Sequence, residues 1–247
     1  MADSVRSISI PKIDATDPAA LAKEIFDDDR WVKDEFSKII SAEVLKFAGS
    51  LAAAFKLFGQ LDKLAEGDEQ AAFVAGFVHG IFDDMLVSTK LLVAGKLMAS
   101  GNLMRQAIEG IAVASLCASR ELVQIRDRKS NVRISYWERV KKDDSKVRSY
   151  KALEHLEVNA TSLGLSIDSV RRLAKARSRL HQFSHPGLMG IASRMALGEP
   201  GPIFLGGSFD TAKIPAYKKE IEDRIGLCGI LPNVIKGLVA SLNKSRN

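Results

Sequence analysis

The sequence predicts an all-α fold, a helical bundle of long antiparallel helices, and three observations carry this prediction. Apolar residues recur at helical spacing over three long segments, 28–65, 68–99 and 102–126. Short turns at Gly67-Asp68 and Ser100-Gly101-Asn102 separate these segments. A short turn returns a helix against its predecessor, so we expect the helices to pack antiparallel. In addition, 46% of the 247 residues are apolar, which is enough for a substantial core.

We expect residues 17–247 to form a single helical-bundle domain, preceded by an extended arm over residues 1–16. Ser and Asp residues that can cap a helix stand before three of the expected helices. These residues are Asp17, Asp68 and Ser166. Pro18 reinforces the first start, because proline suits the first helical position. The last helix is expected over 215–242, with a kink at Pro232.

Two stretches interrupt the long helices. Residues 126–151 are densely charged, with aromatic residues interleaved, and form a charged insertion that could grip a nucleic-acid backbone and stack on bases. An exposed pair of short helices with aromatic undersides is the alternative for this stretch. Residues 188–212 are rich in glycine and proline, which indicates a small hairpin or loop before the C-terminal helix.

The composition excludes several classes of protein. Cys117 and Cys228 lie far apart and match no metal-binding or redox spacing, which indicates a reducing compartment. No uncharged apolar run reaches the roughly 18 residues that a membrane span needs. The sequence therefore predicts a soluble, cytoplasmic protein that does not contact a membrane.

Charge is distributed unevenly along the chain. The first 100 residues contain 11 basic and 16 acidic residues, whereas the remainder contains 25 basic and 14 acidic ones. The basic second part indicates an anionic partner, for which a phosphate backbone is the usual choice. A solvated lysine and arginine surface is the alternative.

The most informative stretch is residues 171–187, RRLAKARSRLHQFSHPG. On a helix, its apolar side chains form one stripe, and four basic residues point away from it. These outward residues are Arg171, Arg172, Lys175 and Arg179, of which the first three are candidates for binding phosphates. By the same arithmetic Arg177, His181 and Ser184 lie beside the stripe and need partners. A proline ends the helix and leaves His185 at its terminus.

These residue types suit one chemistry in particular. RNA can be cleaved by attack of its own 2′-hydroxyl, which requires proton transfer and stabilisation of a charged phosphorane. Histidine supplies the first and arginine the second, so no metal or cofactor is expected. His181 and His185 are spaced for a shared metal, but no carboxylate or third ligand accompanies them. Of the other histidines, His79 is expected in the core and His155 on the surface.

The run from Arg179 to His185, RLHQFSH, resembles the R-x(4–6)-H signature of the HEPN superfamily of small all-α proteins. Active members of that superfamily are metal-independent ribonucleases, usually homodimers with a composite site between protomers. They belong to toxin–antitoxin, abortive-infection and other phage-defence systems. The resemblance implies that Arg179 and His185 are the catalytic pair, that RNA is the substrate, and that an antitoxin or defence protein is a partner.

A second resemblance, to uncharacterised bacterial HEPN-like proteins, involves Arg105 and Glu109 in the motif RQAIE together with the FSHP ending of the basic helix. Arg105 and Glu109 share one helix face, so a structural ion pair is the alternative to a role in the site. Because Arg177 and His181 lie beside the apolar stripe, they are alternatives to the Arg179 and His185 pair.

Three functions therefore compete. The first is a metal-independent ribonuclease. The second is a catalytically silent helical interaction module, which would bind nucleic acid or act as a sensor or partner protein. The third is a small-molecule or metal enzyme in the bundle core, for which only Asp83 and Asp84 near His79 offer side chains.

Overall fold

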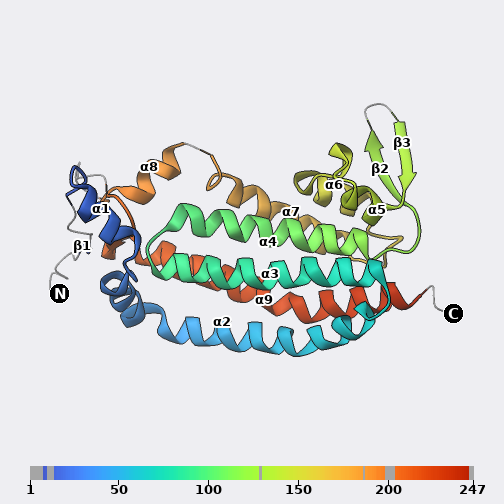
Figure 1. Ribbon diagram of the computed structural model, residues 1–247, viewed down its shortest axis with the longest axis horizontal. Coiled ribbons are helices and arrows are strands. Elements are labelled where there is room, and N and C mark those ends of the chain that lie inside the picture. The colour runs from blue at the N-terminus through green and yellow to red at the C-terminus, as the bar shows by residue number, and fades with distance from the viewer. Residues whose placement is uncertain (1–7, 10–13, 128–129, 186, 198–203, 245–247) are drawn as a thin grey trace.

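The computed structural model describes residues 8–9, 14–127, 130–185, 187–197 and 204–244, and it confirms the all-α fold (Figure 1). Four long helices form the body of the molecule. They are α2 (Arg30–Ala65), α3 (Glu69–Val93), α4 (Leu97–Cys117) and α9 (Ile214–Asn243). As predicted, α2, α3 and α4 pack antiparallel in succession (Figure 1).

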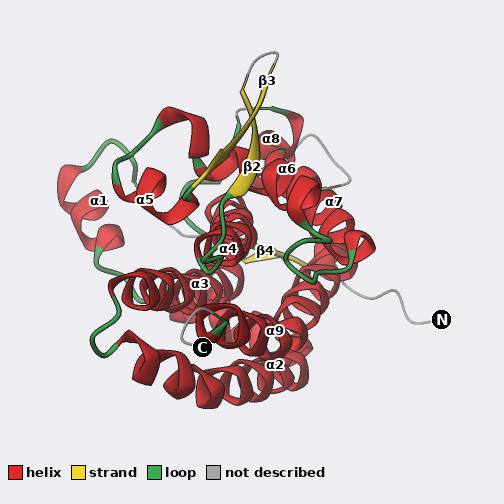
Figure 2. Cartoon of the chain, turned by 90° about the vertical axis from the view of Figure 1, so that its right-hand side faces the viewer, coloured by secondary structure: helices red, strands yellow, loops and turns green. Residues whose placement is uncertain are grey.

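The last helix, α9, returns to α2 and runs beside it in the same direction. Tyr217 in the first turn of α9 contacts Phe36 near the start of α2, with ring centroids 4.6 Å apart. α9 continues through Pro232 to Asn243. Figure 2 shows the bundle from one end, with α6 (Ser149–Asn159) and α7 (Ile167–His181) on the side of α4. The chain is thus closed into one helical body with a shared apolar core.

The turn between α3 and α4 lies earlier than the sequence predicts. Gly95 adopts a positive φ of 71°, and a Cβ at this position would lie 2.3 Å from the carbonyl oxygen of Ser208. Ser100 and Gly101, expected in the turn, lie inside α4. Ser100 exchanges hydrogen bonds with Ser88 of α3, because each hydroxyl donates to the other's carbonyl oxygen at 2.7 Å. The predicted boundary between the two helices was therefore wrong, because Ser100 lies inside α4 and is hydrogen-bonded to Ser88 of α3.

The N-terminal arm is paired with a distant segment. β1 (Ile8–Ser9) pairs antiparallel with β4 (Phe209–Asp210), and the other expected arm residues before position 14 lie outside the described ranges. α1 (Pro18–Ile25) begins as predicted, because the side chain of Asp17 accepts from the backbone N–H of Ala19.

The charged insertion differs from the expected pair of short helices. It begins with a hairpin of β2 (Val123–Asp127) and β3 (Ser130–Ile134), so the third long helix ends at Cys117 and not near residue 126. Alternation explains the strand, because Val123 and Ile125 are buried. Two short helical elements follow, α5 (Tyr136–Lys141) and η1 (Ser145–Val147), and the first of them buries its tyrosine.

Residues 188–212 also contain more helix than expected. α8 (Leu188–Arg194) opens the segment, and a single turn, η2 (Thr211–Lys213), leads from β4 into α9. The central part, residues 198–203, lies outside the described ranges. The predicted cap of α7 is confirmed, because the side chain of Ser166 accepts from the N–H of Ser169.

Two histidines occupy the opposite environments from those expected. His155 is buried in α6, with its Nδ1 3.4 Å from the hydroxyl of Tyr136. Burial lowers the pKa of His155, since removal of water disfavours the charged ring. His79 is exposed on α3, with its ring 6.3 Å from that of Phe58. Both predictions failed because neither the apolar run around His79 nor the charged residues around His155 reveal which helix face is covered.

Among the described residues, two helical segments are long and apolar enough to cross a membrane, Glu69–Val93 and Thr211–Asn243. Both take part in the bundle, where α3 packs on α4 and α9 packs on α2. The central helices of a soluble bundle have the same length and composition, so these two segments are weak evidence for a membrane protein.

Candidate functional site

A buried carboxylate, that of Glu109 in α4, joins three helices. Glu109 is 4% exposed. Its Oε1 accepts hydrogen bonds from Arg105 Nη1 at 3.3 Å and Arg177 Nε at 3.0 Å. Its Oε2 accepts from the hydroxyl of Ser149, the first residue of α6, at 3.1 Å. A buried charge is stable when it is paired and hydrogen-bonded, so Glu109 fixes the direction of both guanidinium groups.

The end of α7 is attached to the same part of α4. The Oδ1 atom of Asn102 accepts from Arg105 Nη2 at 3.3 Å and from the hydroxyl of Ser184 at 2.8 Å. Next to it, a Cβ on Gly101 would lie 2.5 Å from the ring of Phe183, so only glycine admits this aromatic side chain. The segment after α7 is therefore held against α4 by one packed ring and one hydrogen-bonded amide.

This attachment places two imidazoles side by side. The ring centroids of His181 and His185 are 4.4 Å apart, and the planes are inclined at 66°. Both residues are exposed to solvent. The pKa of His181 is lowered below its ordinary value. The largest cause is desolvation, followed by the neighbouring His185, Arg177 and Arg105, because each disfavours a positive charge on the ring.

We call Asn102, Arg105, Glu109, Arg177, His181 and His185 the α4–α7 cluster. Two guanidinium groups face one carboxylate, so the cluster carries one excess positive charge before either imidazole is protonated. The Nε–H of Arg105 is buried and has no hydrogen-bond partner among the described residues. Arginine suits phosphate because of its planar donors, and histidine transfers protons near neutral pH. The cluster therefore combines anion binding with acid–base groups.

Two hollows flank the α4–α7 cluster. One, of about 620 Å³, lies between α3 and α4, and its wall includes Arg105, Glu109 and the ring of Phe73. Asp84 also lines it, and burial, followed by the charge of Asp83, raises the pKa of Asp84 to about 6. The other hollow, of about 460 Å³, lies beside α8 and is lined by Asn102, Ser184 and His185 among others. A ligand can thus approach the cluster from either side.

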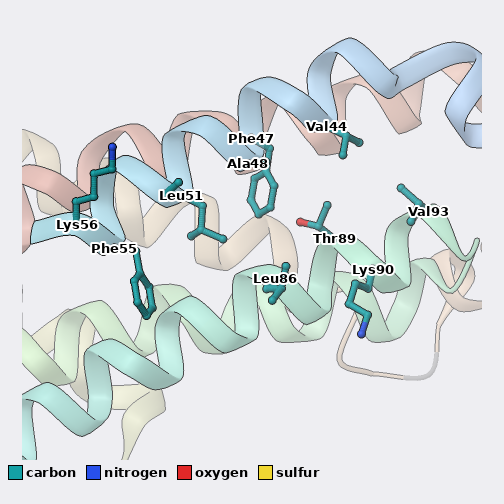
Figure 3. A pocket seen from close by; sticks show the side chains of 11 residues that line it. Val44, Phe47, Ala48, Leu51, Phe55, Lys56, Leu86, Thr89, Lys90 and Val93 are labelled. Carbon is teal, nitrogen blue, oxygen red and sulfur yellow. The ribbon is translucent and has the colours of Figure 1, made fainter. Parts of the chain in front are cut away.

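A third hollow, between α2 and α3, contains no comparable chemistry. It has a volume of about 530 Å³, and Figure 3 shows apolar side chains of both helices around it, with Lys56 and Lys90 as its charged residues. No histidine, carboxylate or cysteine is among its lining residues. We therefore place no catalytic site there.

The structure separates Arg179 from the α4–α7 cluster. Its Nη1 lies 2.8 Å from Glu220 Oε1, and its Nη2 lies 2.7 Å from Asp223 Oδ2, both on α9. Arg177, two residues earlier, turns to the opposite side and reaches Glu109. Of the six residues that the sequence singled out as catalytic, the structure gathers Arg105, Glu109, Arg177, His181 and His185 and leaves out Arg179.

The three expected phosphate-binding residues are also divided. Arg171 is paired with Glu157 of α6, at 2.7 Å between Nε and Oε1. Arg172 and Lys175 line the space between α7 and α9 instead. None of the three is in contact with the histidines, so they do not extend the cluster in the described structure.

Sequence reasoning missed Asn102 and Ser149. Asn102 precedes Arg105 by three residues and shares its helix face, a spacing that could have drawn attention to it. Ser149 lies beyond the hairpin and has no local signal that it meets α4. Ser184 was expected to need a partner, and the structure supplies Asn102.

Within the described ranges, no three His, Cys, Asp or Glu side chains gather closely enough to hold a metal ion. A comparison of the chain with protein-family models, curated proteins and solved structures finds no match.

Proposed function

We propose that this protein is a metal-independent endoribonuclease of the HEPN type, with the α4–α7 cluster as its active site and Arg177 in the role that the motif gives to Arg179. The observation that carries the proposal is the contact between the imidazoles of His181 and His185, 4.4 Å apart by centroid, beside two arginines that share Glu109. Two proton-transfer groups next to an anion-binding pair meet the requirements of RNA cleavage.

In the proposed reaction, the ribose 2′-oxygen attacks the adjacent phosphorus, and the bond to the 5′-oxygen of the next nucleotide breaks. His181 accepts the 2′-hydroxyl proton, because its lowered pKa keeps the ring neutral. His185 donates a proton to the departing 5′-oxygen. Arg105 and Arg177 stabilise the charge on the phosphorane oxygens. The products are a 2′,3′-cyclic phosphate and a 5′-hydroxyl, and Glu109 serves as a positioning residue.

A catalytically silent interaction module is the second candidate, and one observation favours it. Both guanidinium groups of the cluster already contact Glu109, so the network can serve to join α4, α6 and α7 without any substrate. This alternative predicts a stable complex with a partner protein or nucleic acid and no RNA cleavage.

The proposal includes the expected biological setting. We place the protein in the cytoplasm as a homodimer, within a toxin–antitoxin or phage-defence system that supplies an antitoxin or defence partner. The basic second part of the chain supports an anionic substrate. Size-exclusion chromatography with light scattering tests the dimer, and a purely monomeric protein would contradict that part of the proposal.

Cleavage of a labelled RNA in the presence of EDTA tests the activity. We expect the unchanged protein to cleave, and His181→Ala to reduce the rate by about 10²-fold or more, as removal of an acid–base group does. His79→Ala is the matched control, because His79 is exposed on α3 and outside the cluster. Absence of cleavage by the unchanged protein, or equal rates for the two variants, would contradict the proposal.

A further inference from the structure

The face of α7 opposite the α4–α7 cluster borders a groove that the proposed ribonuclease function does not use. The groove lies between α7 and α9, with α4 as its floor, and has a volume of about 930 Å³. It is larger than the three hollows described above. Small-molecule sites occupy roughly 300 to 1,000 Å³, so the volume suits a ligand of that class.

The floor and walls of this α7–α9 groove are aliphatic. Met104, Ile108 and Ile111 of α4 form the floor, Leu173 and Leu180 line the α7 side, and further aliphatic residues of α9 line the other. No aromatic residue and no histidine is among its lining residues. The floor residues are at most 3% exposed, so the accessible apolar surface lies on the walls, at Leu165, Leu173, Ala176, Ile230 and Val234. An aliphatic chain can pack on these walls, whereas a nucleobase has no aromatic ring to stack on.

The polar part of the lining is predominantly basic. Five cationic side chains and two carboxylates line the groove, and they are Arg172, Lys175, Arg179, Lys219, Arg224, Glu220 and Asp223. Several of these residues neutralise one another, since Glu220 and Asp223 pair with the cations at the α9 end. The excess positive charge favours an anionic group over a cationic or neutral one.

Two cations of α7 retain free donors toward the groove. Lys175 has no hydrogen-bond or ion-pair partner among the described residues, and Arg172 bonds only to the hydroxyl of Ser169, at 3.3 Å. They are three residues apart and therefore share one helix face. Both are exposed at the rim, above the aliphatic wall formed by Leu173 and its neighbours.

The charged end of the groove is rigidly built around Arg224. This residue is 1% exposed, and its Nη2 donates to the hydroxyls of Ser88 at 3.0 Å and Ser100 at 2.6 Å. Its Nη1 donates to the Oε2 of Glu220 at 2.9 Å, while its Nε–H has no hydrogen-bond partner among the described residues. Arg224 of α9 is thus bonded to α3 and α4, and these bonds hold its charge at one end of the groove.

We infer that the α7–α9 groove binds a single aliphatic chain with an anionic head group, of the fatty-acid class. The chain lies between the aliphatic walls of α7 and α9, and the carboxylate pairs with Lys175 and Arg172 at the rim. This inference is independent of RNA cleavage, because the residues involved lie on the other side of α7 from His181 and Glu109.

Isothermal titration of the full-length protein with sodium dodecanoate, kept below its critical micelle concentration, tests the inference. We expect saturable binding with one ligand per chain. Dodecyltrimethylammonium has the same chain with a cationic head, and we expect it to bind at least about tenfold more weakly. Equal binding of the two amphiphiles, or no binding of dodecanoate, would overturn the inference.

Matched variants locate the ligand. Ile230 lines the groove on α9 and is 37% exposed, so Ile230→Asp places a charge in the aliphatic wall without burying it deeply. We expect this variant to bind dodecanoate about tenfold more weakly than the unchanged protein, and we expect the same of Lys175→Glu. Val158→Asp is the control, because Val158 is 55% exposed on α6 and is absent from the groove lining. Equal affinities of the Ile230 and Val158 variants would contradict this location.

A vesicle experiment separates free acid from lipid as the source of the ligand. We expect phosphatidylglycerol vesicles to leave the protein in the supernatant after sedimentation, because the groove holds one chain and not a bilayer surface. Sedimentation with the vesicles, without binding of monomeric dodecanoate, would assign the basic rim to a membrane surface and overturn the inference. Circular dichroism confirms that each variant is folded.

Discussion

The arginines on the two faces of α7 have different partners. On one face Arg177 shares the buried carboxylate of Glu109 with Arg105, close to two imidazoles. On the other face Arg179 pairs with two carboxylates of α9 at the edge of an aliphatic groove. Residues two apart on a helix point about 200° apart, so neighbours in a motif can belong to different sites. The two histidines therefore lie in the same cluster as Arg177 and not beside Arg179, although Arg179 has the spacing of the motif.

The two networks should also contribute differently to the stability of the protein. Glu109 is almost fully buried and has three donors, whereas the side chain of Arg179 is 38% exposed and those of its partners Glu220 and Asp223 are 12% and 30% exposed. Buried charges that lose their partners are costly, while exposed ion pairs contribute little. Substitutions on the two faces should therefore differ in stability as well as in activity.

The largest effect on stability is expected from Glu109→Ala. It removes the carboxylate that two guanidinium groups share, and we expect the free energy of unfolding to fall by about 3 kcal/mol. Urea denaturation measures this change. Glu154→Ala, at an exposed position of α6, is the control and should stay within about 0.5 kcal/mol of the unchanged protein. A loss below about 1 kcal/mol for the Glu109 variant would show that the cluster does not join the helices.

A smaller loss is expected from Gly101→Ala, which tests how the end of α7 is attached. The new Cβ would lie 2.5 Å from the ring of Phe183, and such overpacking costs about 1 to 3 kcal/mol. Gly229→Ala in α9 is the matched control, since a Cβ there meets nothing within 4 Å and alanine favours the helix. Thermal unfolding should move in opposite directions for the two variants. A rise for both would contradict the contact between Gly101 and Phe183.

On the opposite face, Arg179→Gln should change stability little. The side chain of Arg179 is 38% exposed, and ion pairs with an exposed member contribute about 0 to 1 kcal/mol. Urea denaturation of this variant beside Arg177→Gln provides the comparison, and we expect the Arg177 substitution to be the more destabilising. The reverse order would mean that the α9 face is the stronger connection.

The most subtle effect is on the pH dependence of cleavage. The lowered pKa of His181 keeps its ring neutral, and able to accept a proton, down to a lower pH than an ordinary histidine. The rate should therefore fall with acidification only below the usual histidine value of about 6.5. A pH–rate profile of the unchanged protein measures this midpoint. A midpoint clearly above that value would argue against His181 as the base.

The sequence predicted the bundle well because its signals are local. Apolar periodicity identified the long helices, and the cap residues Asp17, Asp68 and Ser166 all accept backbone hydrogen bonds where expected. Predictions failed where a distant segment decided the outcome. The turn moved to Gly95 because it approaches Ser208, which no local pattern reveals.

The candidate site was predictable only in part. Helical geometry indicated that Arg177, His181 and Ser184 point inward and need partners. The structure supplies Glu109 for Arg177 and Asn102 for Ser184, whereas the prediction was wrong for His181, which is exposed. The pairing of Arg177 with Glu109 joins residues 68 positions apart, so it depends on how α7 lies on α4. The motif spacing favoured Arg179, yet spacing along the chain says nothing about which face of α7 meets the bundle.

RNA cleavage in EDTA by Arg177→Ala and Arg179→Ala, each confirmed as folded by circular dichroism, tests the central claim most directly. If the α4–α7 cluster is the active site, Arg177→Ala should lose about 10²-fold or more in rate, as loss of a charge-stabilising donor does. Arg179→Ala should then retain a rate within about twofold of the unchanged protein, a change of less than 0.5 kcal/mol in the barrier. A large loss for Arg179→Ala with an unchanged rate for Arg177→Ala would contradict the account.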